Sequence, residues 1–277
     1  MDPIKAAAGA GAVALVIGGT AYGIYNSIDP MPECDVLSSI SGFGTTGDYQ
    51  SSESKYGYYY GRYLVDPDKI TGSKNKDWWE WSFRLWKSSN KSELGSKFKD
   101  VKSSYKSDSD NNEKDKALNQ ICKAAYKEAK TSVTAAGSNS QFKESDVWLF
   151  CSISLTRTKP LFLKDSGTQN IQEDKNLIED TATNGNEKLG KKHKDGLVST
   201  RVSSNDWFWD LREKEYPISA INETVDNSTQ DIFKLRKNNG KTVKQTCQDA
   251  YSKTSNDTNE VPEQELKKYC FLEKTSN

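Results

Sequence analysis

Apolar residues are concentrated at the start of the chain and in two places farther along it. The first concentration, residues 6–25, is a run of twenty residues without a charged side chain. A helix rises about 1.5 Å per residue, so this run spans a hydrocarbon core of about 30 Å. No A-x-A-like cleavage site follows it, which favours a transmembrane signal anchor over the alternatives, a cleaved signal peptide or a buried helix. Lys5 precedes the run and Asp29, Glu33 and Asp35 follow it, which predicts a cytoplasmic N-terminus and an extracellular body.

The other two concentrations form an internal repeat. An aromatic motif opens each copy, Asp-Trp-Trp-Glu-Trp from residue 77 and Asp-Trp-Phe-Trp-Asp from residue 206. A Cys-x-x-Ala-Tyr motif follows at residues 122 and 247, and a second cysteine stands in an apolar-aromatic run at residues 151 and 270. These landmarks occur in the same order in both copies, which predicts a duplicated module.

Each copy has the periodicity of α-helices. Leu94, Phe98, Val101 and Tyr105 recur at helical spacing in the first copy, and Pro262 marks a helix start in the second. The predicted fold is mainly α, with a transmembrane helix followed by two small helical bundles joined by a polar linker. The predicted divisions are residues 1–30 (tail and anchor), 31–76 (Ser/Gly/Tyr-rich stalk or small subdomain), 77–163 (first module), 164–205 (linker) and 206–277 (second module).

Composition narrows the functional classes. The 39 Lys and Arg residues balance 39 Asp and Glu residues, so no overall field attracts nucleic acid, and no nucleic-acid partner is expected. Only 34% of the residues are hydrophobic and the mean hydropathy is −0.83, which predicts small cores. A single histidine, His193, lies among lysines and is expected to be solvated, so neither a metal nor another cofactor is predicted.

Four of the five cysteines are expected to form disulfides within the modules. The repeat pairs Cys122 with Cys151 and Cys247 with Cys270. Bundles of this size have marginal cores, and a disulfide that closes such a loop contributes about 3 kcal/mol. The alternative is buried, reduced cysteines in a cytosolic protein. Cys34, near the predicted membrane surface, has no assigned role.

Tyrosines cluster between residues 56 and 63, where aromatic residues and glycines favour a short strand, a hairpin or a stalk. Local packing is the simpler interpretation of this cluster, and a ligand surface formed by Tyr58, Tyr59, Tyr60 and Tyr63 is the functional one. The tryptophans, which recur at helical spacing, are expected in the cores. A hydrolase that uses two of the many carboxylates is a further alternative, although no pair stands out in the sequence.

The start Met-Asp-Pro-Ile-Lys, the Ala/Gly-rich span and the polar body resemble the paralogous families of uncharacterised surface proteins in haemotropic mycoplasmas. The helix-borne cysteine followed by a second cysteine near the end of the module is also similar to theirs. The resemblance implies a membrane-anchored surface protein with a role in antigenic variation or host contact, and no catalytic residue.

The sequence therefore predicts a non-enzymatic, single-pass membrane protein with an extracellular body. Its expected partners are the lipid bilayer, through the N-terminal helix, and a host-cell protein or glycan. An adhesin-like module that binds a ligand or glycan through surface aromatic residues is the alternative function. The oligomeric state stays open.

Overall fold

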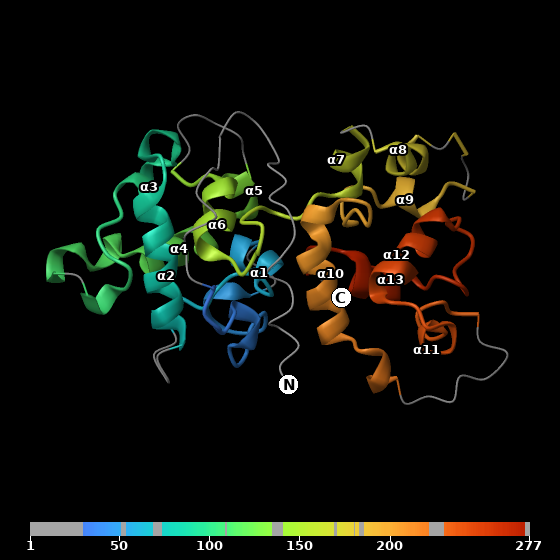
Figure 1. The fold of residues 1–277 in the computed structure, drawn as a ribbon, viewed down its shortest axis with the longest axis horizontal. Helices are drawn as coiled ribbons and strands as arrows, with labels where there is room; N and C mark the ends of the chain where they lie inside the picture. The colour runs from blue at the N-terminus through green and yellow to red at the C-terminus, as the bar shows by residue number, and fades with distance from the viewer. Residues whose placement is uncertain are drawn as a thin grey trace.

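The computed structural model describes residues 30–50, 54–68, 74–108, 110–134, 141–168, 171–179, 181–182, 186–221 and 230–274. This part of the chain contains helices and isolated β-bridges but no strand, so the predicted mainly α class is confirmed. It forms two lobes side by side, which we call the first lobe (residues 30–153) and the second lobe (residues 161–274) (Figure 1). The predicted membrane span at residues 6–25 lies outside the described residues. Among the helices that are described, none has the length and apolar character needed to cross a membrane.

The helices of both lobes are short. Those of the first lobe are α1 (Tyr56–Tyr60), α2 (Lys74–Ser88), α3 (Ser96–Lys99), α4 (Leu118–Lys127), α5 (Lys130–Thr134) and α6 (Glu144–Cys151). Those of the second lobe are α7 (Leu163–Thr168), α8 (Gln172–Ile178), α9 (Leu189–Lys192), α10 (Asp206–Glu215), α11 (Arg236–Asn239), α12 (Val243–Ser252) and α13 (Glu263–Cys270). Short 3₁₀ turns connect several of them.

The aromatic motifs lie on α2 and α10 and point into the cores. Trp78 and Trp79 are fully buried and meet edge to face, with ring centroids 4.9 Å apart. Phe208 and Trp209 repeat this arrangement at 4.8 Å. Helices that are apolar on more than one side need burial: α2 packs on α4 and α6, and α10 packs on α12.

A disulfide joins two helices in each lobe, with the predicted pairing. Cys122–Cys151 links α4 to α6 and Cys247–Cys270 links α12 to α13, each with a Cα–Cα distance of 5.8 Å. All four cysteines are buried. The bonds span 29 and 23 residues, and loops of this length correspond to about 3–4 kcal/mol of stabilisation each in the chain-entropy description.

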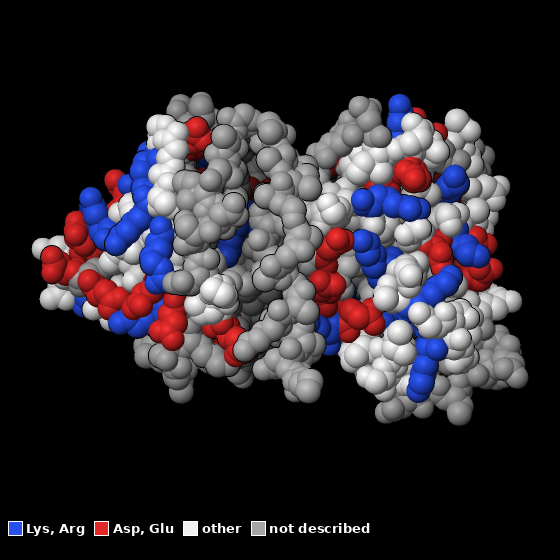
Figure 2. Space-filling model, in the orientation of Figure 1, with Lys and Arg blue, Asp and Glu red and all other residues white. Residues whose placement is uncertain are grey.

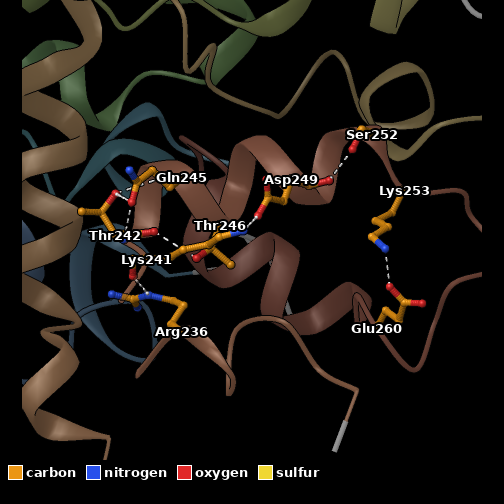
Figure 3. A network of polar contacts seen from close by, with 9 residues as sticks. All are labelled: Arg236, Lys241, Thr242, Gln245, Thr246, Asp249, Ser252, Lys253 and Glu260. Carbon is orange, nitrogen blue, oxygen red and sulfur yellow. Dashed lines mark hydrogen bonds and ion pairs between the residues drawn. The ribbon is translucent and has the colours of Figure 1, made fainter. Parts of the chain in front are cut away.

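Local polar contacts fix the start of α12, the helix that carries Cys247. The Thr242 hydroxyl accepts a hydrogen bond from the Gln245 backbone N–H (3.2 Å), and the Gln245 side chain accepts one from the Thr242 N–H (3.0 Å). Lys241, immediately before this capping box, pairs with Asp249 at 2.5 Å (Figure 3). The two hydrogen bonds of the capping box satisfy backbone N–H groups that the start of a helix leaves without partners.

The two lobes repeat the same hydrogen bonds at corresponding positions. The tyrosine four residues after the first cysteine donates to a buried carbonyl in each lobe: Tyr126 to Val65 (3.2 Å) and Tyr251 to Val198 (2.7 Å). The backbone N–H of each valine donates to the carbonyl of its lobe's second cysteine, at 3.0 and 3.1 Å. The correspondence therefore extends from the disulfides into segments that precede the aromatic motifs.

The indole contacts set the register of the repeat. Trp79 Nε1 donates to the Asp66 carbonyl (3.3 Å), and Trp209 Nε1 donates to the Ser199 carbonyl (3.2 Å). Trp79 therefore corresponds to Trp209, whereas matching the two Asp-Trp motifs from their first residues pairs Trp79 with Phe208. The contacts thus shift the sequence-based match of the motifs by one residue.

The predicted stalk and linker are both packed into the lobes. In residues 31–76, Leu37 is buried and its N–H donates to the Leu64 carbonyl (2.9 Å). In residues 164–205, helix α7 packs on α8, α8 on α9, and α9 on α12. The bond from the Leu163 N–H to the Leu197 carbonyl (2.8 Å) repeats that of Leu37. The described residues of the expected polar linker are thus packed as part of the second lobe.

The apolar series at residues 94–105 does not form one long helix. Leu94, Phe98, Val101 and Tyr105 are all buried, but α3 ends at Lys99 and irregular chain follows. Residues 101–108 return along η7 (Asn111–Lys116) and the start of α4, where Lys102 N–H donates to the Lys116 carbonyl (3.0 Å). Helical spacing therefore predicted which side chains are buried, but not the path of the backbone.

Candidate functional site

The tyrosine-rich segment forms helix α1 instead of the predicted strand or hairpin. Gly57 lies on the side of α1 that faces α4, where an added Cβ atom would stand 3.1 Å from Tyr126 Cβ. The missing side chain lets the two helices approach closely, and tertiary packing thus overrides the strand preference of the tyrosines.

The tyrosines lie at the junction between the lobes. Tyr58, Tyr60 and Tyr63 are 3%, 0% and 0% exposed, whereas Tyr59 is partly exposed. A surface that contacts a ligand must be accessible, so these three side chains do not form the open surface that the sequence suggested. The second lobe contributes to the contacts of Tyr63 and Tyr60, through Trp207 and Glu273.

The lobes dock through different faces. Tyr63 and Trp148 of the first lobe contact Trp207 of α10, with ring centroids 5.9 and 6.4 Å apart, and Tyr63 also contacts Phe208 at 6.0 Å. Tyr63 corresponds to Gly196 in the second lobe, because their carbonyls accept equivalent bonds from the residue two positions after the second cysteine, at 2.9 and 3.2 Å. The contact is therefore head to tail.

Arg212 carries a buried charge at this junction. Its side chain is 2% exposed, and it donates to the Phe271 carbonyl (2.8 Å) and across the junction to the Tyr63 hydroxyl (2.9 Å). Glu215 provides the counter-charge at 2.8 Å. A buried guanidinium is stable only with such partners, so Arg212 ties the geometry of the junction to that of α10.

A connected set of polar side chains closes the junction. The Tyr60 hydroxyl donates to Glu273 (2.7 Å), which also pairs with Lys130 (2.5 Å). Lys159 donates to the Tyr60 hydroxyl and pairs with Glu144, both at 2.9 Å. Glu273 belongs to the second lobe and Tyr60, Lys130 and Glu144 to the first, so the network joins the lobes through the segment that follows Cys270.

The tyrosine hydroxyls of the junction are protonated at physiological pH. Burial raises the pKa of Tyr56 and of Tyr60 far above the ordinary range. The negative charges of the carboxylates that accept hydrogen bonds from these hydroxyls raise both pKa values further. Burial raises the pKa of Tyr63 to about 12, although the Arg212 charge opposes the rise. Tyr56 and Tyr60 therefore act as hydrogen-bond donors to carboxylates, and an acid–base role at neutral pH does not follow from their environment.

The carboxylates relevant to the hydrolase alternative have structural contacts. Glu144 and Glu273 each pair with a lysine in the junction network. Burial raises the pKa of Asp146 to about 6, against the opposing hydrogen bond from the Gly95 N–H (2.7 Å). Asp146 is 2% exposed, so its carboxylate is not open to a substrate. No group of three His, Cys, Asp or Glu side chains placed to hold a metal ion occurs in the described part of the chain.

His193 is less solvated than the sequence predicted. The ring is half-buried and lies 5.8 Å from the Phe271 ring, and burial is the main cause that lowers its pKa. His193 corresponds to Tyr60, since the carbonyls of both accept from the N–H four residues later, Leu197 (3.1 Å) and Leu64 (3.2 Å). Only the first lobe uses this position at the junction.

A surface that the sequence analysis did not single out lies on the outer side of α2. The Phe83 and Trp86 rings stack with centroids 5.3 Å apart and planes 5° apart, and both are half-buried. Lys87 Nζ lies 4.7 Å from the Phe83 ring centroid and Lys91 Nζ 3.9 Å from that of Trp86. Trp86 Nε1 donates to the Phe98 carbonyl (2.7 Å), which fixes the indole. A Phe-x-x-Trp-Lys pattern on a predicted helix is the only signal for it in the sequence.

Comparisons with protein-family models, with curated proteins and with solved structures find no match for this chain. The resemblance to the surface proteins of haemotropic mycoplasmas therefore stays a prediction. The functional interpretation depends on the residues and their contacts.

Proposed function

We propose that this chain is a non-enzymatic surface protein that residues 6–25 anchor in the cell membrane. Its two lobes lie outside the cell, where they contact host molecules or serve antigenic variation. The observation that carries the proposal is the pair of disulfides. Each is buried within one lobe and joins equivalent helices, Cys122–Cys151 and Cys247–Cys270. Such bonds form and persist in oxidising surroundings, which supports an exported body.

The anchor and the topology rest on the sequence. The uncharged run at residues 6–25 is long enough to span a bilayer, and the charges that flank it favour a cytoplasmic N-terminus. The junction supports a compact body, because Tyr60, Glu144 and Glu273 belong to the network that holds the two lobes together. Their hydrogen bonds and ion pairs give these side chains a structural role.

Two measurements on intact cells test this proposal. Peptide mapping under non-reducing conditions should find the Cys122–Cys151 and Cys247–Cys270 pairs and no alkylated Cys122 or Cys247. Protease added outside the cells should cut within residues 78–272 while cytosolic markers stay intact. Alkylated Cys122 and Cys247, or a body protected along with the cytosolic markers, would contradict the proposal.

A ligand- or glycan-binding role is the second candidate. The tyrosine cluster does not support it, because Tyr58, Tyr60 and Tyr63 are buried. The stacked and partly exposed Phe83 and Trp86 on α2 favour it at a different place.

A further inference from the structure

We propose that the outer face of α2 and the α3 segment beside it bind an acidic glycan, and we name this the α2 face: Phe83, Trp86, Lys87, Lys91, Lys97 and Lys99. The proposal deepens the proposed function, on which it rests, since it assigns the host contact to one surface and one class of ligand. Two properties of the α2 face carry it: an excess of positive charge and a stacked aromatic pair.

The α2 face has an excess of positive charge in a protein whose formal net charge is zero. Residues 82–102 hold six basic and two acidic side chains. Lys87, Lys97 and Lys99 are exposed, and none of them forms a salt bridge with any described residue. Other lysines of the same lobe are paired, for example Lys76 with Asp108 (2.9 Å). Positively charged side chains gather over α2 in Figure 2. An anionic partner complements this charge.

The lysines surround an aromatic pair whose orientation is fixed. Trp86 is held by its hydrogen bond to the Phe98 carbonyl, and Lys97 and Lys99 are the neighbours of Phe98 in the sequence. Lys91 Nζ donates to the Trp86 carbonyl and to the Ser89 carbonyl (3.1 Å), so its ammonium is also fixed. A preorganised surface loses less conformational entropy when it binds.

This combination suits a sugar that carries carboxylate or sulfate groups. The apolar C–H face of a pyranose ring packs on an aromatic ring, while ammonium groups pair with the acidic substituents. An extended acidic peptide uses the charges but has no pyranose C–H face for Phe83 and Trp86 to contact. The stacked pair therefore favours a glycan over an acidic protein.

In the second lobe, the position equivalent to Trp86 contacts the other lobe. By the register that Trp79 and Trp209 set, Trp86 corresponds to Tyr216, whose hydroxyl accepts from Arg62 of the first lobe (3.4 Å). Glu215, next to it, pairs with the same Arg62 at 3.6 Å. By the same register Phe83 corresponds to Glu213, which pairs with Arg236 of its own lobe at 3.0 Å, so the equivalence concerns the Trp86 position alone.

The test measures binding of the purified full-length protein to two acidic probes, a heparin-derived hexasaccharide and sialyllactose, with their desulfated and asialo forms as controls. Lys87→Gln/Lys99→Gln is expected to raise the Kd of an acidic probe about tenfold. Lys123→Gln/Lys127→Gln removes the same charge from paired lysines of the same lobe and is expected to change the Kd less than about twofold. Phe83→Leu keeps apolar volume without the ring and is expected to raise the Kd about fivefold.

An equal rise in Kd for the two double-lysine variants would overturn the glycan assignment. So would an unchanged Kd for Phe83→Leu, or a protein that binds neither acidic probe. Binding of poly-glutamate as tight as that of the hexasaccharide would overturn it in favour of an acidic protein. None of these binding results bears on whether the body lies outside the cell, which the protease experiment tests separately. Failure of the glycan assignment and failure of the proposed function are therefore distinguishable.

Discussion

Arg212 offers the sharpest test of whether the two lobes unfold as one unit. Arg212→Met removes the guanidinium but keeps an unbranched apolar side chain at a position that is 2% exposed. The hydrogen bonds to Phe271 and Tyr63 have a charged donor and contribute about 1.5–3 kcal/mol each. The Glu215 side chain is 30% exposed, so loss of that ion pair adds only about 0.5 kcal/mol. We expect the free energy of unfolding to fall by about 3–5 kcal/mol.

A double-mutant cycle isolates the bond across the junction. Tyr63→Phe removes only the hydroxyl that Arg212 contacts and is expected to lower the free energy of unfolding by about 1–2 kcal/mol. The two changes should couple by about 1–2 kcal/mol, measured by urea unfolding of the full-length protein with both tryptophan fluorescence and circular dichroism. Lys214→Met, at an exposed position of α10, is the matched control and should change stability by less than about 0.5 kcal/mol. A coupling energy below about 0.3 kcal/mol would refute the inference that this bond joins the lobes.

Three further predictions concern the lobes themselves. Cys247→Ala/Cys270→Ala should lower the free energy of urea unfolding by about 3 kcal/mol, and a reducing agent, which opens both disulfides, should lower that of the unaltered protein by more; equal stability of the variant and the unaltered protein would contradict the role of the disulfide. Gly57→Ala should lower stability by about 1–3 kcal/mol, because its Cβ would stand 3.1 Å from Tyr126 Cβ, and an unchanged Tm would count against that packing. The raised pKa of Asp146 means that its contribution to stability is present below about pH 4 and is lost as the pH rises through about 6. Asp146→Asn should remove this fall in the free energy of unfolding with rising pH. Parallel curves of unfolding free energy against pH for the two proteins would show that Asp146 does not cause the fall.

The signals that predicted structure correctly are local. The buried tryptophans lie on single helices, where spacing reports on a helix face, and each cysteine lies in a short motif that recurs in both copies of the repeat. The register of the repeat depends on contacts with residues outside the motifs. The two Asp-Trp motifs look alike, so their sequences alone align them from their first residues. Only the contacts of Trp79 with Asp66 and of Trp209 with Ser199 show which residues correspond.

The packed segment predicted to be a linker was missed because part of its core is polar. The hydroxyls of Ser166 and Ser199 both donate to the buried carboxylate of Asp174, at 2.5 Å each. A count of apolar residues does not register such a network, although buried polar groups with satisfied hydrogen bonds are compatible with a folded core.

The tyrosine cluster was misassigned for another reason. Tyr63 is buried partly by Arg212 and Trp207, which lie more than 140 residues away in the chain. Neither the pattern around Tyr63 nor its composition contains that contact. The α2 face was missed because Phe83 and Trp86 look like core residues in a helix that is apolar on several sides.

The head-to-tail contact gives the two halves of the chain unequal freedom to change during evolution. A substitution at Tyr63 affects both lobes, whereas at the corresponding Gly196 the constraint comes from the nearby Phe271 ring of its own lobe. Tyr60 and His193 form a second such pair. Related sequences are therefore expected to diverge between their halves first at these positions, while the disulfides and the indole contacts change together. A single-lobed relative would have no reason to keep an aromatic residue at the position of Tyr63.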